Sequence, residues 1–224
     1  MSTVTFYDNP SANAPIRVRI VLLLKQVAFE PVLVDVYSPD GEAVASDSAL
    51  NPQRMVPALR DGEFVLSQSM AIIEYLEERF PEPPILPGDA RGRARVRSLA
   101  QLIACDAQPL VNFRVREALR HEFGLPEGEV RRWVVEWLAR SLRDLEASLA
   151  RHSSTGRYCH GDTPTLADVC LFPHVLIAQR FGVPLDDYPT VMRVFEACRD
   201  VPAFRDAQVA SQASSATTRM HRHY

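Results

Sequence analysis

Two patterns of apolar residues divide the sequence, and this division constrains the fold more than any other feature. In residues 1–81, short β-prone runs alternate with helical patterns, whereas the rest of the chain carries helical patterns alone. Strands must pair into a sheet, and amphipathic helices must cover that sheet or pack on one another. The sequence therefore predicts an α/β domain followed by an all-helical domain.

The order of elements in the first part is that of a thioredoxin-like domain. Strands are expected at residues 4–7, 29–36, 57–59 and 64–67, helices at 17–26 and from Ser69 until Pro81, and a loop with a short helix at 37–51. Asp61-Gly62, between the last two strands, is typical of a two-residue hairpin turn. The order β-α-β-α-β-β-α indicates a small mixed sheet covered by helices.

Prolines mark the end of this domain. Four of them, Pro81, Pro83, Pro84 and Pro87, stand close together where periodicity is lost, which is typical of a semi-rigid linker. The domains predicted are a thioredoxin-like domain at 1–81, a linker at 82–89, an all-helical domain at 90–210 and a disordered tail at 211–224. Helices are expected at residues 90–120, 127–151, 165–181 and 188–198, with a short one after Pro202.

Composition favours small-molecule chemistry. The chain of 224 residues has a formal net charge of −3, and its Lys and Arg residues are spread out, so no nucleic-acid partner is expected. The longest apolar run, Ile20 to Leu24, is too short to span a bilayer, and residues 1–9 lack the pattern of a signal peptide. A cytoplasmic protein with no membrane partner is expected. Because no C-x-x-C or H-E-x-x-H spacing occurs, neither disulfides nor a metal site is expected.

Val56-Pro57 and Gln68-Ser69 form the most informative pair of motifs. An apolar residue before proline at a strand start can adopt a cis bond, which would turn the N–H and C=O of Val56 outward to pair with an extended peptide. Ser69 then offers a hydroxyl at a helix N-terminus, where a carboxylate is favoured. The order of these motifs predicts a site for a γ-glutamyl peptide such as glutathione.

The sequence resembles the glutathione transferase family, most closely its zeta class together with bacterial maleylpyruvate isomerases. The resemblance covers nearly the whole chain and is carried by residues 6–7, 17–20, 50–52, 56–59, 68–78, 86–87, 108–110, 161–168 and 180–181. It implies a thioredoxin-like glutathione domain joined to a helical domain, usually in a homodimer. It also implies roles for single residues: Gln53, Val56, Pro57, Gln68, Ser69 and Gln108 for glutathione, and Arg180 with Arg17 or Arg114 for carboxylates of a small-molecule substrate. Arginine suits that second task because its planar guanidinium holds a carboxylate in bidentate fashion.

The chain departs from the family where the glutathione thiol would lie. Zeta enzymes carry a Ser-Ser-Cys run just before the Arg-Val-Arg segment, whereas this chain has Ala12-Asn13-Ala14 before Arg17-Val18-Arg19. Asn13 and Ser11 are therefore the candidates for stabilising the thiolate, and both also fit an ordinary loop or cap role. Either Arg17 or Arg19 faces the substrate, since residues two apart on a helix point in different directions.

Two other motifs have structural interpretations. Thr165-Leu166-Ala167-Asp168 has the form of a capping box, so Asp168→Ala is expected to harm folding and to leave the chemistry of any folded enzyme intact. Trp133 and Trp137 lie four apart on a helix, and packing is the better explanation for them than a stacking platform.

Three functions are consistent with these residues. The first is a glutathione-dependent cis-trans isomerase of a maleyl compound, maleylacetoacetate or maleylpyruvate. The second is a general transferase that conjugates or reduces hydrophobic electrophiles with glutathione, which the missing serine favours. The third is a glutathione-binding protein without turnover. Isomerisation is the main hypothesis.

Overall fold

The computed structural model describes residues 3–34 and 50–209. The predicted tail at 211–224 and nearly all of the predicted loop at 37–51 lie outside these ranges. Contacts group the described residues up to Pro84 with residues 201–209 in one compact unit, and Ile85–Asp200 in a second. The domain limits drawn from the sequence stay predictions.

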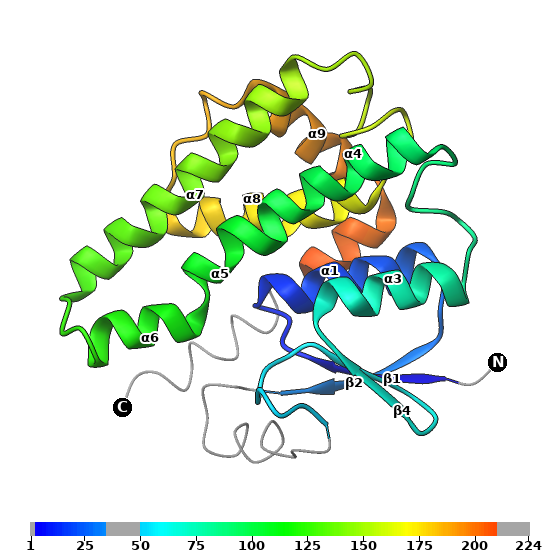
Figure 1. Cartoon of the computed structure of the whole chain (residues 1–224), viewed down its shortest axis with the longest axis horizontal. Helices are drawn as coiled ribbons and strands as arrows, with labels where there is room; N and C mark the ends of the chain where they lie inside the picture. The colour runs from blue at the N-terminus through cyan, green and yellow to red at the C-terminus, as the bar shows by residue number, and fades with distance from the viewer. Residues whose placement is uncertain (1–2, 35–49, 210–224) are drawn as a thin grey trace. The chain divides into compact units, whose positions relative to one another are not determined.

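The first unit contains a four-stranded mixed sheet. Its elements in chain order are β1 (Val4–Asp8), α1 (Asn13–Leu24), β2 (Phe29–Leu33), β3 (Ala58–Asp61), β4 (Phe64–Ser67) and α3 (Ser69–Arg79). The strand order is β2-β1-β3-β4, with β1 parallel to β2 and antiparallel to β3, and β3 antiparallel to β4. Helices α1 and α3 lie side by side on one face of the sheet (Figure 1). The thioredoxin-like prediction is confirmed.

Several boundaries in this unit differ from the sequence prediction, most clearly the start of α1 and the hairpin turn, and β2 ends at Leu33 rather than at residue 36. Helix α1 begins at Asn13, four residues before the expected Arg17, because Pro15 is tolerated in a first helical turn, where its missing N–H costs nothing. The hairpin turn is Gly62-Glu63 rather than Asp61-Gly62, since Asp61 still pairs with Phe64. Gly62 adopts the φ of +59° that this turn requires.

Lys25, just after α1, binds the C-terminal end of α3 and the chain that follows it. Its side chain is buried, and its ammonium donates to the carbonyls of Phe80 at 2.7 Å and Pro83 at 2.9 Å while pairing with Glu77 at 2.6 Å. These three acceptors match the three donors of a lysine. The chain that follows α3 is therefore held at a fixed place on this unit.

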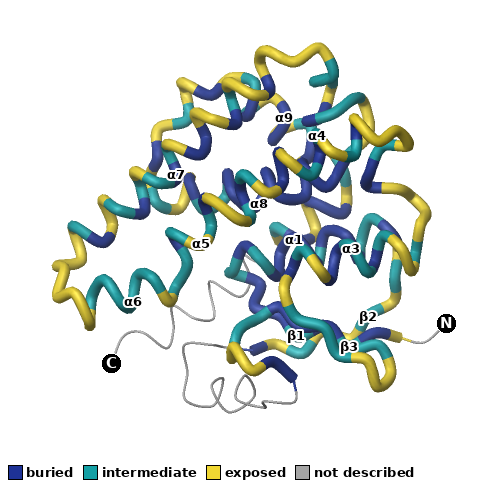
Figure 2. Tube along the Cα trace, viewed as in Figure 1, coloured by how far each residue is buried: buried dark blue, intermediate teal, exposed yellow. Residues whose placement is uncertain are grey.

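The second unit is helical, as predicted. It comprises α4 (Ala90–Gln101), the π-helical segment η1 (Leu102–Ala107), α5 (Gln108–Val111), α6 (Phe113–His121), α7 (Glu127–Ala150), α8 (Leu166–Phe181) and α9 (Pro189–Arg199). Helix α8 forms the centre of this unit, and Figure 2 shows it buried along most of its length. Residues 202–209, which belong to the first unit, form the short helix expected after Pro202.

The single helix expected at residues 90–120 is wrong. A π-helical segment interrupts it at Leu102–Ala107, and it breaks at Asn112. The Asn112 side chain accepts a hydrogen bond from the N–H of Val115 at 2.9 Å and so caps a new helix, α6. A polar side chain turned back on the backbone overrides a helical pattern that is otherwise continuous.

The capping box of α8 is confirmed. Asp168 accepts from the N–H and the hydroxyl of Thr165, both at 2.7 Å, and from the N–H of Cys159 at 2.8 Å. Trp133 donates from its indole to the carbonyl of Leu110 at 2.8 Å, which accords with a packing role. Within the described residues, no helix is both long and apolar enough to cross a membrane, and none of their His, Cys, Asp and Glu side chains gather in a group able to hold a metal ion.

Candidate functional site

The turn into α3 carries the most unusual backbone of the sheet unit. Gln68, the N-cap of α3, has φ +73° and ψ +113°, a conformation that a residue with a Cβ rarely adopts. Its side chain does not cap the helix, and its amide Nε2 donates instead to the side-chain oxygen Oε1 of Gln53 at 2.5 Å. Strained backbone of this kind gathers at sites that bind ligands.

Ser69 opens α3 directly after this residue. It is buried, and it stands where the first backbone N–H groups of the helix have no partner within the helix. The N–H groups of a first helical turn and the positive end of the helix dipole together favour an anion. The predicted carboxylate site would therefore use backbone and side chain together.

The loop before β3 brings Gln53 and Val56 to the same region. Asn51 is buried, donates from its amide to the carbonyl of Met55 at 2.7 Å and accepts from the N–H of Gln53 at 3.0 Å. It thereby fixes the loop that carries both residues. Sequence reasoning gave Asn51 no role, although an asparagine before proline is a known signal for such a turn.

The Val56-Pro57 bond is cis, as the motif suggested. Pro57 is buried, and β3 begins one residue later. Among the described residues, the N–H and C=O of Val56 make no backbone hydrogen bond. Both groups stand next to a sheet strand and are available to an extended peptide.

The N-terminal end of α1 holds both thiolate candidates. Asn9 accepts from the N–H of Ser11 at 3.1 Å and donates to the carbonyl of Val34 at 3.1 Å, so it shapes the loop. Asn13, the first residue of α1, is only 6% exposed. Its amide nitrogen has no hydrogen-bond partner in the part of the chain that the structure describes.

The two arginines of α1 have different surroundings. Arg19 forms an ion pair with the buried Asp8 and lies over the ring of Phe6, and burial lowers the pKa of its guanidinium. Arg19 therefore holds α1 to β1. Arg17 is among the largest fully buried side chains, at 1% exposure, and is the arginine of this pair that stays a candidate for the substrate.

The remaining predicted residues belong to the helical unit. Gln108 follows the π-helical segment, and its side-chain oxygen is buried with no partner among the described residues. Arg114 on α6 and Arg180 in the last turn of α8 are exposed. Beside them, Arg116 and Arg131 lie over the ring of Phe181, at 5.7 and 6.0 Å from its centroid.

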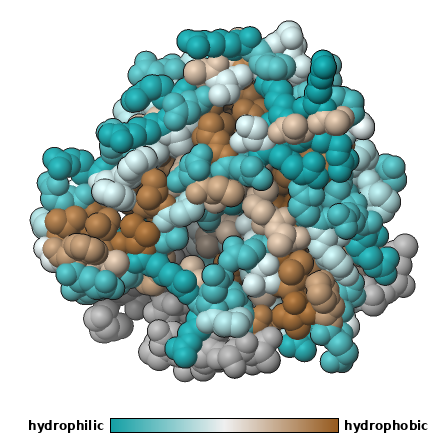
Figure 3. All heavy atoms as spheres, viewed as in Figure 1, coloured by the Kyte–Doolittle hydropathy of each residue, from teal (hydrophilic) through white to brown (hydrophobic). Residues whose placement is uncertain are grey.

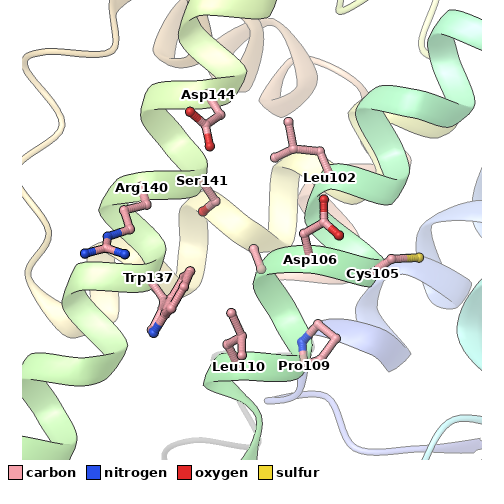
Figure 4. A pocket seen from close by; sticks show the side chains of 10 residues that line it. Leu102, Cys105, Asp106, Pro109, Leu110, Trp137, Arg140, Ser141 and Asp144 are labelled. Carbon is pink, nitrogen blue, oxygen red and sulfur yellow. The ribbon is translucent and has the colours of Figure 1, made fainter.

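The helical unit also contains a pocket of about 380 Å³, shown in Figure 4. It lies between α7 and the segment formed by η1 and α5, and the carboxylates of Asp106 and Asp144 point into it from opposite sides. None of the predicted site residues lines it. Elsewhere on this unit, apolar atoms gather at the turn between α6 and α7, where Phe123 and Leu125 are exposed (Figure 3).

Comparisons with known proteins identify the family. Residues 7–84 match the glutathione S-transferase N-terminal domain, and residues 114–197 match the glutathione S-transferase C-terminal domain. A maleylpyruvate isomerase of Ralstonia sp. is 46% identical over 200 residues, which cover 89% of this chain and 94% of that protein. The chain belongs to the glutathione S-transferase family.

Other members of the family are similar over almost their whole length. A maleylacetoacetate isomerase of Pseudomonas aeruginosa is 41% identical over 95% of this chain and 97% of its own length. A solved maleylpyruvate isomerase, described as a bacterial glutathione transferase of the zeta class, has a TM-score of 0.88 and 43% identity over 92% of this chain and 97% of its own. The maleylacetoacetate isomerase of Methylobacterium extorquens, solved with malonate and glutathione, has a TM-score of 0.85 and 39% identity, with the same shares covered.

Proposed function

We propose that this glutathione S-transferase is a glutathione-dependent isomerase that converts the cis double bond of a maleyl compound, maleylpyruvate or maleylacetoacetate, to trans. The site at Val56, Gln68 and Ser69 carries this proposal. Two relatives with 46% and 41% identity, both named as isomerases of such compounds, support it. Their names differ in the substrate, so both maleyl compounds belong in the test.

The residues of the sheet unit fit glutathione. Within the described residues, the backbone N–H and C=O of Val56 beside β3 make no backbone hydrogen bond, as an extended tripeptide needs. Ser69 at the start of α3 suits the γ-glutamyl carboxylate, and the side chains of Gln68 and Gln53 lie hydrogen-bonded next to it. In the helical unit, Gln108 presents a buried acceptor without a described partner, which would accept an N–H of the ligand.

When bound, glutathione supplies a thiolate that adds to the double bond, permits rotation about the single bond that results, and leaves again. The protein must hold the substrate carboxylates while the carbon skeleton turns. Arg180 and Arg114, both exposed, and the buried Arg17 are the arginines proposed for this task. A guanidinium group suits this task because its planar donors hold a carboxylate in bidentate fashion.

One experiment separates the candidate functions. The purified protein is incubated with glutathione and, in parallel, with maleylpyruvate, with maleylacetone as a stand-in for maleylacetoacetate, and with an aryl halide. We expect isomerisation without net loss of thiol. Thiol loss with no isomerisation would instead make the protein a general transferase, and glutathione binding with neither reaction would make it a binding protein.

We also propose that the protein is a homodimer and that it works in the cytoplasm. Membership of the glutathione S-transferase family supports both proposals. Light scattering on the purified chain tests the dimer. A mass equal to that of one chain across the accessible concentration range would contradict it.

A further inference from the structure

We infer that the side-chain amide of Asn13 donates a hydrogen bond to the sulfur of bound glutathione and lowers the pKa of its thiol. The inference rests on the proposed function, since it requires glutathione to occupy the sheet unit. It gives this chain a specific replacement for the serine that zeta enzymes carry before their Arg-Val-Arg segment.

The burial of Asn13 is the main observation. Asn13 is only 6% exposed and its amide nitrogen is buried, and a buried amide normally has its hydrogen bonds made because an unmade one costs free energy. The amide nitrogen of Asn13 has no partner among the described residues, whereas the equivalent nitrogens of Asn9 and Asn51 donate to the carbonyls of Val34 and Met55. A ligand atom that accepts hydrogen bonds explains why this donor is left open.

The place of Asn13 indicates a negatively charged acceptor. It is the first residue of a twelve-residue helix, so the unpaired N–H groups and the positive end of the helix dipole act at the same point. The first turn of α1 contains no acidic residue that would cancel this potential. A thiolate gains from both effects, and a neutral thiol gains little.

Two other polar side chains of this loop and helix are engaged elsewhere. Arg19 is paired with Asp8, and Asn9 uses both ends of its amide to hold the loop. Ser11 is only half-buried, and its own N–H is bonded to Asn9. Asn13 is therefore the described side chain in this loop and first turn that combines burial with an open donor.

An amide donor also sets how the thiol loses its proton. The nitrogen of an asparagine side chain donates and cannot accept, so it does not take the proton from sulfur. The S–H bond breaks, the proton goes to solvent, and the sulfur keeps the electron pair that the amide and the helix end stabilise. The pH dependence should then follow a single ionisation, that of the bound thiol.

The test measures the pKa of the thiol of bound glutathione directly. Thiolate absorbance in the ultraviolet is followed against pH for glutathione bound to the parent protein and to the Asn13→Ala, Asn13→Ser and Ser11→Ala variants. We expect Asn13→Ala to raise the thiol pKa by about one to two units, the size expected for a lost hydrogen bond to a charged group. Asn13→Ser, which restores a donor, should recover most of the shift.

S-methylglutathione is the matched ligand control, because it has no ionisable thiol. Its dissociation constant should change less than about twofold in Asn13→Ala, while that of glutathione near neutral pH weakens about tenfold, in line with a shift of one pKa unit. An unchanged thiol pKa in Asn13→Ala, or a shift in Ser11→Ala alone, would overturn the inference. If the parent protein bound neither ligand, the proposed function itself would fail.

Discussion

Gln68 is a residue whose backbone conformation conflicts with its side chain. With φ at +73° and ψ at +113°, the main chain lies in a region that glycine adopts far more readily, and such positions cost about 1–3 kcal/mol. The sequence nevertheless has a glutamine at this position, and its side-chain amide donates a hydrogen bond to the side-chain oxygen of Gln53. The conflict supports the proposal that the side chain serves the ligand rather than stability.

Replacing Gln68 should separate these two effects. Gln68→Gly relieves the backbone, so the free energy of unfolding should equal that of the parent or exceed it by up to about 2 kcal/mol. Gln68→Ala removes the same side chain and keeps the strain, so it should not be stabilised. Both variants should bind glutathione more weakly by calorimetry. A glycine variant less stable than the alanine variant would show that the strain argument is wrong.

His160 is a residue whose protonation should affect stability. Burial, and then the nearby Arg95, lower its pKa, and its Nδ1 lies 3.3 Å from Nη1 of that arginine. A histidine with a lowered pKa in the folded state contributes stability above its unfolded pKa of about 6.5, and this contribution is lost as the pH falls through the folded value.

We therefore expect the free energy of unfolding to fall as the pH is lowered from about 7.5 to about 5.5. This fall should be smaller in His160→Gln. His121→Gln is the matched control, since the His121 side chain is 74% exposed. Urea titrations at both pH values give the measurement. The same slope in the parent and in both variants would rule out His160 as the source.

At the scale of elements, α8 depends on a carboxylate placed inside the protein. Asp168 is fully buried, and burial raises the pKa of its carboxyl group, while the three hydrogen bonds from Cys159 and Thr165 act in the opposite direction. These bonds join the start of α8 to the loop before it. Their loss would leave three donors without a partner in the core.

Asp168→Ala should lower the free energy of unfolding by at least about 3 kcal/mol, because each buried donor left unpaired costs about 1–3 kcal/mol. The folded fraction should still bind glutathione. Asp89→Ala is the control, since Asp89 caps α4 from an exposed position and its loss should cost much less. Equal melting temperatures for the two variants would contradict the special role of Asp168.

Elements were predictable from the sequence where the signal is local. The capping box at 165–168 and the start of α3 at Ser69 each depend on a few adjacent residues, and both lie where expected. The π-helical segment at Leu102–Ala107 and the early start of α1 were missed, because helical periodicity does not tell a π turn from an α turn or locate a first turn that contains Pro15. Their positions depend on tertiary packing.

At the scale of the whole molecule, ligand binding should couple to folding. Glutathione at about 100 times its dissociation constant should stabilise the protein by about 2.7 kcal/mol if it binds the folded state alone. Calorimetry with and without glutathione measures the shift in melting temperature. Ser69→Ala should shrink this shift at the same ligand concentration, whereas Ser67→Ala, two residues earlier, should not.

The candidate site was also predictable only in part. Val56, Gln68 and Ser69 could be proposed from the sequence because each belongs to a short motif at the edge of a strand or helix, and the cis bond and the start of α3 lie where those motifs place them. The preference for Asn13 over Ser11 needed coordinates because it depends on burial, and so did the pairing of Arg19 with Asp8, which is distant in sequence. Sequence gives the motifs, and packing decides the surroundings of each side chain.

The π-helical segment gives its helix an unusual tolerance of length. A π turn closes its hydrogen bond one residue later than an α turn, so one residue removed from Leu102–Ala107 would let a regular α-helix form with little change in the direction of the residues that follow. A deletion that would rotate everything after it in an ordinary helix should therefore be absorbed here by the fold.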